Sequence, residues 1–379
     1  MALSDNDLRK WEYREHTKVK HILLQKYLKA WIPILGKWHE TICYFDGFAG
    51  RGEYLDDKGT LIAEGSPIIA LKEADKISGS FNKFLCFFIE KNPDNFQNLN
   101  NVLEREKANI KNWNKIEIVK ENNEFAAVVE SLFGVLEQKK YSLMPSFFFV
   151  DPFGFSGVPF RVIQKILSNP KTEVFFTLMT RDINRFLTVD HAEKYLDELF
   201  GTTEWKKIQS ATKPEVALIN FYREQLHVSA KAKYSLAFRV CMSEIAQTVY
   251  YLIHVTNNFK GHNIMKSIMS HQSADGNFAY LGPNDVAEKS QVKLFNINDI
   301  NDLKNCLIER FKGKTIAYNM IHEKICEPWY SEPPFIDKHY QDAIKELEKE
   351  KKVTINGKGP RGGLNNSQVT FLIQTSSVK

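Results

Sequence analysis

The chain has 379 residues, a formal net charge of +5 and a pI near 8.7, with 43% hydrophobic and 26% charged residues. This length and composition predict a sizeable core in one large or two unequal domains. The basic balance is too mild to require an anionic partner. The N-terminus has no apolar signal core, and no stretch approaches the ~20 apolar residues of a membrane span, so we expect a cytoplasmic protein.

The five cysteines are scattered along the chain and form no C-x-x-C pair. Three of them lie in apolar, strand-like runs, where a free thiol behaves as a small hydrophobe. They are Cys43, Cys86 and Cys241. This pattern indicates neither a disulfide framework nor a metal site.

Residues 17–36 have apolar side chains at helical spacing, which predicts a helix with one buried face that stops at Gly36. Three basic side chains, Lys18, Lys20 and His21, fall in its first turn, where cations oppose the helix dipole. We interpret them as solvated; the alternative is that they are held there to meet an anion.

A glycine-rich turn follows the first predicted strand, Ile42 to Phe45. Glycine permits positive φ and lets a ligand approach backbone amides. The glycine spacing is not that of dinucleotide sites and is typical of the acidic-x-x-x-Gly-x-Gly turn of S-adenosylmethionine-dependent methyltransferases. An ordinary tight turn is the alternative. The candidate cofactor residues here are Asp46, Gly47, Phe48, Ala49, Gly50 and Gly52.

Strands and helices then alternate, which predicts a doubly wound, Rossmann-like α/β sheet with helices on both faces. Continuous apolar runs indicate strands that are covered on both sides. The further strands are predicted at 83–89, 116–119, 146–150, 173–179, 234–242 and 248–256. The intervening helices are predicted at about 66–74, 92–107, 123–138, 159–168 and 261–268.

Ligands of such sheets bind beyond the carboxyl ends of the strands, and three further strand ends are polar. Glu90 suits two ribose hydroxyls, and Asn122 is placed to reach an adenine edge. The fourth strand ends in Asp151, Pro152 and Phe153, which resembles the [Asp/Asn/Ser]-Pro-Pro-[Tyr/Phe] turn of amino-methyltransferases. In that turn the polar side chain and a carbonyl hold the exocyclic amine while the aromatic ring stacks on a flipped base. A plain proline turn is the alternative.

Arg181, Asn184 and Arg185 follow the fifth strand and either clamp a phosphate at the same cleft or belong to a solvated loop. Residues from about 188 to 230 have a helical, more polar pattern that we interpret as a cap insertion. We place a methyltransferase-like domain at 1–298 and a second domain at 299–379.

The C-terminal part has three predicted helices, at 300–311, 315–326 and 337–350, followed by a basic, glycine-rich hairpin. This order predicts a winged helix, with Lys358 and Arg361 in the hairpin able to contact a phosphate backbone. Four acidic residues in the third helix dilute the basic patch, so protein contact is an open alternative. They are Asp342, Glu346, Glu348 and Glu350.

The sequence as a whole resembles the three-Cys-motif partner (TcmP) family of bacterial proteins. The residues that carry the resemblance are Lys20-His21, Tyr44 to Tyr54, Gly65-Ser66-Pro67, Glu90-Lys91, Asp151 to Gly154, Ile183-Asn184-Arg185, and Gly261 with Met265-Lys266. The resemblance implies a class I methyltransferase fold, an S-adenosylmethionine site, a C-terminal winged helix and a partner protein whose three-cysteine motif can hold an iron–sulfur cluster. The chain is more distantly similar to adenine-N6 methyltransferases of ribosomal RNA, although Phe153 replaces their second proline.

The leading hypothesis is therefore an S-adenosylmethionine-dependent methyltransferase that modifies an exocyclic amine of a nucleic acid. The second is a methyltransferase-like binding module that docks a three-cysteine-motif partner without turnover. A nucleotide-binding reductase is the third, and the absent dinucleotide spacing argues against it.

Overall fold

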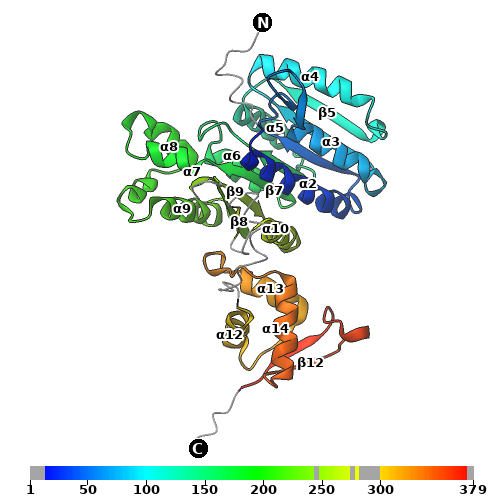
Figure 1. Ribbon diagram of the computed structural model, residues 1–379, viewed down its shortest axis with the longest axis vertical. Helices are drawn as coiled ribbons and strands as arrows, with labels where there is room; N and C mark the ends of the chain where they lie inside the picture. The colour runs from blue at the N-terminus through cyan, green and yellow to red at the C-terminus, as the bar shows by residue number, and fades with distance from the viewer. Residues whose placement is uncertain (1–12, 243–246, 274–277, 281–298, 374–379) are drawn as a thin grey trace, which may run out of the picture.

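The computed structural model describes residues 13–242, 247–273, 278–280 and 299–373. An eight-stranded sheet forms its centre, in the order β10-β8-β9-β7-β6-β1-β4-β5 (Figure 1). The strands are β1 (Thr41–Asp46), β4 (Lys83–Ile89), β5 (Ile116–Glu121), β6 (Ser146–Val150), β7 (Thr172–Leu178), β8 (Tyr234–Cys241), β9 (Thr248–Thr256) and β10 (Ala279–Tyr280).

The strand order confirms the predicted doubly wound sheet. The chain moves outward from β1 through β4 and β5, returns to β6 on the other side of β1, and continues to β7, all in parallel. Within the described part of this sheet, the antiparallel pairs are those of β9 with its neighbours β7 and β8. The direction of winding reverses between β1 and β6, which is where open α/β sheets bind their ligands.

Helices cover both faces because the strands are apolar on both sides; β6, for example, is buried along its whole length. One face is covered by α2 (Glu15–Gly36), α3 (Ser66–Lys76), α4 (Pro93–Lys107) and α10 (Phe259–Gln272). The other is covered by α5 (Phe125–Lys139), α6 (Phe160–Leu167), α7 (Thr180–Phe186), α8 (Glu193–Phe200) and α9 (Pro214–Val228). No helix among the described residues is both long and apolar enough to cross a membrane.

Two local elements differ from the sequence-based expectations. Residues 180–186 form the short helix α7 and not a loop. A two-stranded hairpin, β2 (Glu53–Leu55) with β3 (Leu61–Glu64), joins the glycine turn to α3. The hairpin was not predicted because its strands are short and half-exposed, so they lack the apolar run that marks the strands of the main sheet.

The C-terminal part is a winged helix, as predicted, with its own hydrophobic core. Its helices are α12 (Ile300–Phe311), α13 (Tyr318–Cys326) and α14 (Asp337–Lys349), and its sheet has the order β11-β13-β12. The strands are β11 (Thr315–Ala317), β12 (Val353–Asn356) and β13 (Gln368–Phe371). The prediction that the second helix begins at Thr315 was wrong, because residues 315–317 pair with β13. The expected domain boundary adjoins residues 281–298, which lie outside the described part of the chain.

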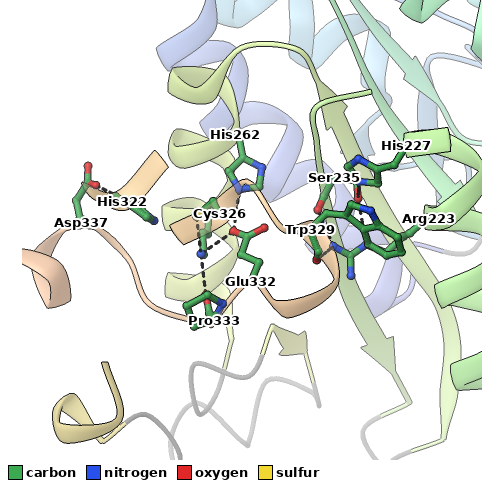
Figure 2. Close-up of polar contacts among 11 residues, drawn as sticks. Arg223, His227, Ser235, His262, His322, Cys326, Trp329, Glu332, Pro333 and Asp337 are labelled. Atoms are coloured by element: carbon green, nitrogen blue, oxygen red, sulfur yellow. Dashed lines mark hydrogen bonds and ion pairs between the residues drawn. The ribbon is translucent and has the colours of Figure 1, made fainter. Parts of the chain in front are cut away.

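The winged helix packs against the large domain below α10 (Figure 1). A buried ion pair joins them: Lys266 Nζ of α10 lies 2.6 Å from Glu332 Oε1, and His262 Nε2 lies 2.8 Å from the same oxygen. Figure 2 shows Glu332 beside His262 and Cys326 at this joint. A few residues away, the Trp329 ring stacks on His227, with ring centroids 4.7 Å apart. The joint is therefore ionic and aromatic, and its Lys266–Glu332 ion pair is buried.

Candidate active site

The glycine turn after β1 and the Asp151 turn after β6 meet at the same edge of the sheet, on either side of the winding reversal. They line one pocket together with residues from α2, β2 and the start of α3. The lining residues are His21, Phe48, Ala49, Gly50, Gly52, Glu53, Tyr54, Gly65, Ser66, Asp151 and Phe153. Six of these are sequence-predicted site residues: Phe48, Ala49, Gly50, Gly52, Asp151 and Phe153.

Two glycines of the turn need their special backbone. Gly50 and Gly52 have φ of +61° and +82°, which other residues rarely adopt. Gly52 is also in close contact with its surroundings, because a Cβ there would lie 2.9 Å from a methyl carbon of Leu99. The turn is therefore shaped as predicted, with backbone amides that a ligand can approach.

Glu90, at the end of β4, holds the turn from the neighbouring strand. Its Oε2 accepts a hydrogen bond from Gly50 N at 2.9 Å, and its Oε1 accepts one from Asn92 N at 2.7 Å. Burial raises the pKa of the Glu90 carboxyl, while these two backbone bonds oppose the rise. The Asn95 side chain also hydrogen-bonds to this carboxylate and opposes the rise in its pKa. A carboxylate has about four lone-pair sites, so it can still accept a further donor.

The Asn122 side chain hydrogen-bonds to the protein backbone outside the pocket. Its amide donates to the carbonyl oxygens of Glu90 at 2.8 Å and Lys91 at 3.1 Å, and it does not line the pocket. Its carbonyl oxygen makes no hydrogen bond with the described residues. Asn122 therefore stabilises the turn that carries Glu90.

Asp46 is completely buried beneath the turn. Tyr44 donates a hydrogen bond to Asp46 Oδ2 at 3.2 Å, while Asp46 Oδ1 has no hydrogen-bond partner among the described residues. Burial raises the pKa of Asp46 to about 7, against the opposing effect of the Ser66 and Tyr44 hydroxyls. A buried carboxylate oxygen without a donor is a place where a cationic group of a ligand would be stabilised. Gly47 packs closely on the Phe125 ring.

Asp151 is held by two side chains that the sequence analysis did not assign to the site. Lys20 Nζ lies 2.7 Å from Oδ1 and 2.5 Å from Oδ2, and Thr177 Oγ1 donates to Oδ1 at 2.6 Å. The interpretation of Lys20 and His21 as solvated was wrong, because both are buried. The helical pattern contained a signal: Lys20 shares a helix face with Leu24 and the other apolar residues of α2.

His21 lies beside this ion pair as a neutral ring. Burial, with a smaller effect of the Lys20 charge, lowers its pKa to about 4. Its ring packs edge-on against Tyr54, with centroids 5.7 Å apart. Phe153, in contrast, leaves 62% of its surface exposed at the mouth of the pocket.

The other predicted substrate residues lie apart from the pocket lining. Arg181 contacts the Met242 sulfur at 3.8 Å, Arg185 is exposed, and Asn184 Oδ1 is buried without a partner among the described residues. Lys358 forms an ion pair with Glu348 at 2.6 Å, whereas Arg361 is exposed in the turn between β12 and β13. The helices at 190–228 contribute no residue to the pocket lining.

One further cluster has the side chains of a metal site. Ligand atoms of His262, Cys326 and Glu332 lie within 4.8 Å of one another at the domain joint. The ammonium of Lys266 contacts Glu332 Oε1, the Cys326 sulfur at 3.7 Å and the carbonyl oxygen of Pro333 at 2.8 Å. A protein cation therefore takes the place that a metal ion would need.

Comparison with known proteins identifies the C-terminal part. Residues 285–360 match the family model described as a GMT-like wHTH domain. No curated protein matches the sequence of this chain.

Several solved structures are similar in fold. Protein LPL1258 from Legionella pneumophila is 11% identical with a TM-score of 0.37, over 62% of this chain and 84% of that one. An O-methyltransferase from Bacillus cereus in complex with SAH is 14% identical with a TM-score of 0.33, over 61% and 80%. The N-terminal domain of human METTL16, also with SAH, is 11% identical with a TM-score of 0.33, over 64% and 70%. Because these scores lie below 0.5, the strand order itself carries the fold assignment.

Proposed function

We propose that this chain is an S-adenosylmethionine-dependent methyltransferase that acts on an exocyclic amine of a nucleic acid. One observation carries the proposal: the positive-φ glycine turn, the buried Glu90 carboxylate and the Asp151 turn come together at the winding reversal of the sheet. The resemblance to the TcmP family points the same way. We further propose residues 1–298 as the methyltransferase domain and 299–379 as the winged helix.

The residues present fit the cofactor. The Oδ1 atom of Asp46 lacks a hydrogen-bond partner among the described residues and suits an ammonium group. The Glu90 carboxylate would accept hydrogen bonds from the ribose hydroxyls. Gly50 and Gly52 would let the amino-acid end approach the backbone. Asn122 would lie near the adenine. When bound, the cofactor supplies a methyl group on a positively charged sulfur.

The acceptor side of the pocket would be formed by Asp151, Pro152 and Phe153. The Asp151 carboxylate would accept a hydrogen bond from the amine and orient its lone pair, and the exposed Phe153 ring would stack on the base. Lys20 and Thr177 hold Asp151 in one rotamer, which favours positioning over proton abstraction. Arg181, Asn184 and Arg185 would contact the backbone next to the acceptor.

The winged helix would provide most of the nucleic-acid affinity. The glutamates that dilute the charge of α14 are all paired: Glu346 and Glu350 with Lys304, and Glu348 with Lys358. Lys338, Lys345 and Lys349 share one face of α14 and form no ion pair within the described residues. This face also carries Asp342 and would lie along phosphates, with Arg361 of the wing beside it.

Titration calorimetry with S-adenosylmethionine, with NADH as the control ligand, tests the cofactor class. Micromolar binding of the first ligand alone is expected. Transfer of labelled methyl from the cofactor to DNA or RNA then tests the substrate class. Binding of NADH alone would replace the proposal with the reductase alternative.

A second candidate is a binding module without turnover, which docks a three-cysteine-motif partner protein. The observation that favours it is the pairing of Asp151 with Lys20, which occupies both carboxylate oxygens. An Asp151→Ala variant separates the two candidates. It should abolish methyl transfer in an enzyme, whereas a scaffold would bind its partner equally well with or without this side chain.

A further inference from the structure

A second pocket lies at the amino ends of the parallel strands, on the opposite side of the sheet from the glycine turn. It is bordered by α2 and α10, which pack side by side (Figure 1), and by the start of β7. Since β7 runs parallel to β6, the start of β7 lies far from the carboxyl ends of β1 and β6, where the candidate active site is. The pocket shares no lining residue with the candidate active site.

The floor of this pocket is a carboxylate with one open oxygen. The Glu173 side chain is only 8% exposed, and both of its hydrogen bonds end on Oε2: one from Tyr27 Oη and one with His254 Nε2 at 3.0 Å. Oε1 accepts no hydrogen bond from the described residues. A buried carboxylate is costly unless donors satisfy it, so Oε1 favours a ligand with an N–H group.

Gly261 explains how α10 approaches this carboxylate. A Cβ at Gly261 would lie 2.9 Å from both Glu173 oxygens and from the Tyr27 hydroxyl. Only a residue without a side chain therefore leaves the carboxylate open to the pocket. Gly261 is one of the residues that carry the family resemblance, and the candidate active site does not use it.

The walls and the mouth have different chemistry from the floor. Trp31 and Thr172 are at most 3% exposed, and the indole Nε1 and the Thr172 hydroxyl have no partner among the described residues. At the mouth, Lys171 and Lys260 are exposed, and neither forms an ion pair within the described residues. Burial lowers the pKa of His39, which also lines the pocket, and the Lys171 charge adds to this effect.

The size of the pocket limits the ligand. Its cavity volume is about 190 Å³, somewhat more than the ~150 Å³ cavity that holds a benzene ring. One flat heterocycle therefore fits inside, and anything larger must extend past the mouth. A ligand matched to the pocket has an N–H donor at its inner end, a ring against Trp31 and a negative charge at its outer end.

The geometry points to a nucleotide-binding site, in which the base donates to Glu173 Oε1 and the phosphate lies between Lys171 and Lys260. The ring edge of each base carries an N–H donor, and phosphate is a strong partner for lysine. The site would bind a nucleoside monophosphate. Guanine is expected to bind best, because its two adjacent N–H groups can share the two lone pairs of Oε1. This inference does not depend on the methyltransferase proposal.

The test is calorimetric titration of the full chain with GMP, AMP, CMP and UMP, and with guanosine. Lys171→Ala/Lys260→Ala is expected to weaken GMP binding at least tenfold and to leave guanosine binding unchanged. Glu173→Gln should weaken both. The matched control is Lys26→Ala/Lys29→Ala, which removes two exposed lysines of α2 outside the pocket and should change neither.

The acceptor pocket is the rival location, because a nucleic-acid methyltransferase also binds a base. Asp151→Asn distinguishes the two: GMP affinity stays unchanged if the nucleotide binds at Glu173 and falls if it binds at the acceptor turn. The inference is overturned if none of the four nucleotides binds at millimolar concentration, or if GMP binding withstands both the double lysine variant and Glu173→Gln.

Discussion

Lys20 and Asp151 stand 131 positions apart in the chain and form a partly buried ion pair, with Nζ 2.7 and 2.5 Å from the two carboxylate oxygens. The lysine comes from the N-terminal helix and the aspartate from the turn after β6. The pair therefore ties α2 to the acceptor side of the candidate active site. It also orients the Asp151 carboxylate at the edge of the candidate active site.

Lys20→Met should destabilise the protein by about 1–3 kcal/mol, because it leaves the partly buried Asp151 carboxylate without its cation. The free energy of unfolding from urea titration measures this loss. Adding Asp151→Asn to Lys20→Met should recover most of it, since the stranded charge is then removed. The control is Lys18→Met in the same helix turn, whose side chain is 52% exposed and which should change stability by less than about 0.5 kcal/mol. Equal losses at both positions would contradict the importance of the pair.

Glu90→Ala should weaken S-adenosylmethionine binding by about 1–3 kcal/mol, because it removes the proposed ribose acceptor and leaves the Gly50 and Asn92 N–H groups without partners. Calorimetry gives the affinity, and circular dichroism checks that the fold is kept. Glu64→Ala, a partly exposed glutamate in β3 outside the pocket, is the control. Unchanged affinity in the Glu90 variant would show that the ribose is held elsewhere.

The raised pKa of Asp46, about 7, predicts two pH effects of opposite sign. The folded protein keeps a proton that the unfolded chain releases between its ordinary pKa, 3.8, and about 7. This group therefore lowers the free energy of unfolding as pH rises through that range and adds no further loss above it. Cofactor binding behaves oppositely, because the ammonium requires the carboxylate, so affinity should rise about tenfold per pH unit up to about pH 7.

Calorimetry in buffers of different ionisation enthalpy measures this proton release directly. The Asp46→Asn variant should bind S-adenosylmethionine weakly at every pH, and its affinity should no longer rise with pH. A wild-type affinity that is flat below neutral pH would contradict the contact between Asp46 and the ammonium group.

Glu332→Ala should loosen the winged helix from the large domain, because it leaves the Lys266 ammonium buried without a counter-charge at a cost of about 3 kcal/mol or more. Limited proteolysis should then cut the chain near the joint faster than in the parent protein. Replacing both partners, Lys266→Met with Glu332→Leu, should restore much of the resistance. Glu327→Ala, paired at the surface with Lys324, is the control and should have little effect.

Replacing Lys338, Lys345 and Lys349 together by glutamine should weaken nucleic-acid binding. The slope of log K against log salt concentration should become about two to three units less steep. Fluorescence anisotropy over a range of salt concentrations measures both. Lys358→Gln should have a smaller effect, because Lys358 is already paired with Glu348. If the triple variant bound as the parent does, the winged helix would serve protein contact.

The sequence by itself determined the doubly wound sheet, the winged helix and the two turns of the candidate site. These features depend on local patterns: apolar runs such as Phe147–Val150, helical spacing, and glycines with positive φ such as Gly50 and Gly52. Each pattern acts over a few residues, so it can be recognised without knowing the rest of the chain. The sequence also shows the positive charge of the α14 lysines, but it does not show that the neighbouring glutamates are paired with other lysines.

Only the tertiary structure decided which charged groups are buried and with what. Lys20 reaches Asp151, Lys266 reaches Glu332, and Glu173 lies beneath Gly261, each across a long separation in sequence. A lysine or glutamate on a helix or strand looks like a solvated side chain until its partner is known, because burial of a charge is favourable only with that partner in place. The order of the strands and the packing of α2 and α10 bring these partners together, and no local pattern encodes that arrangement.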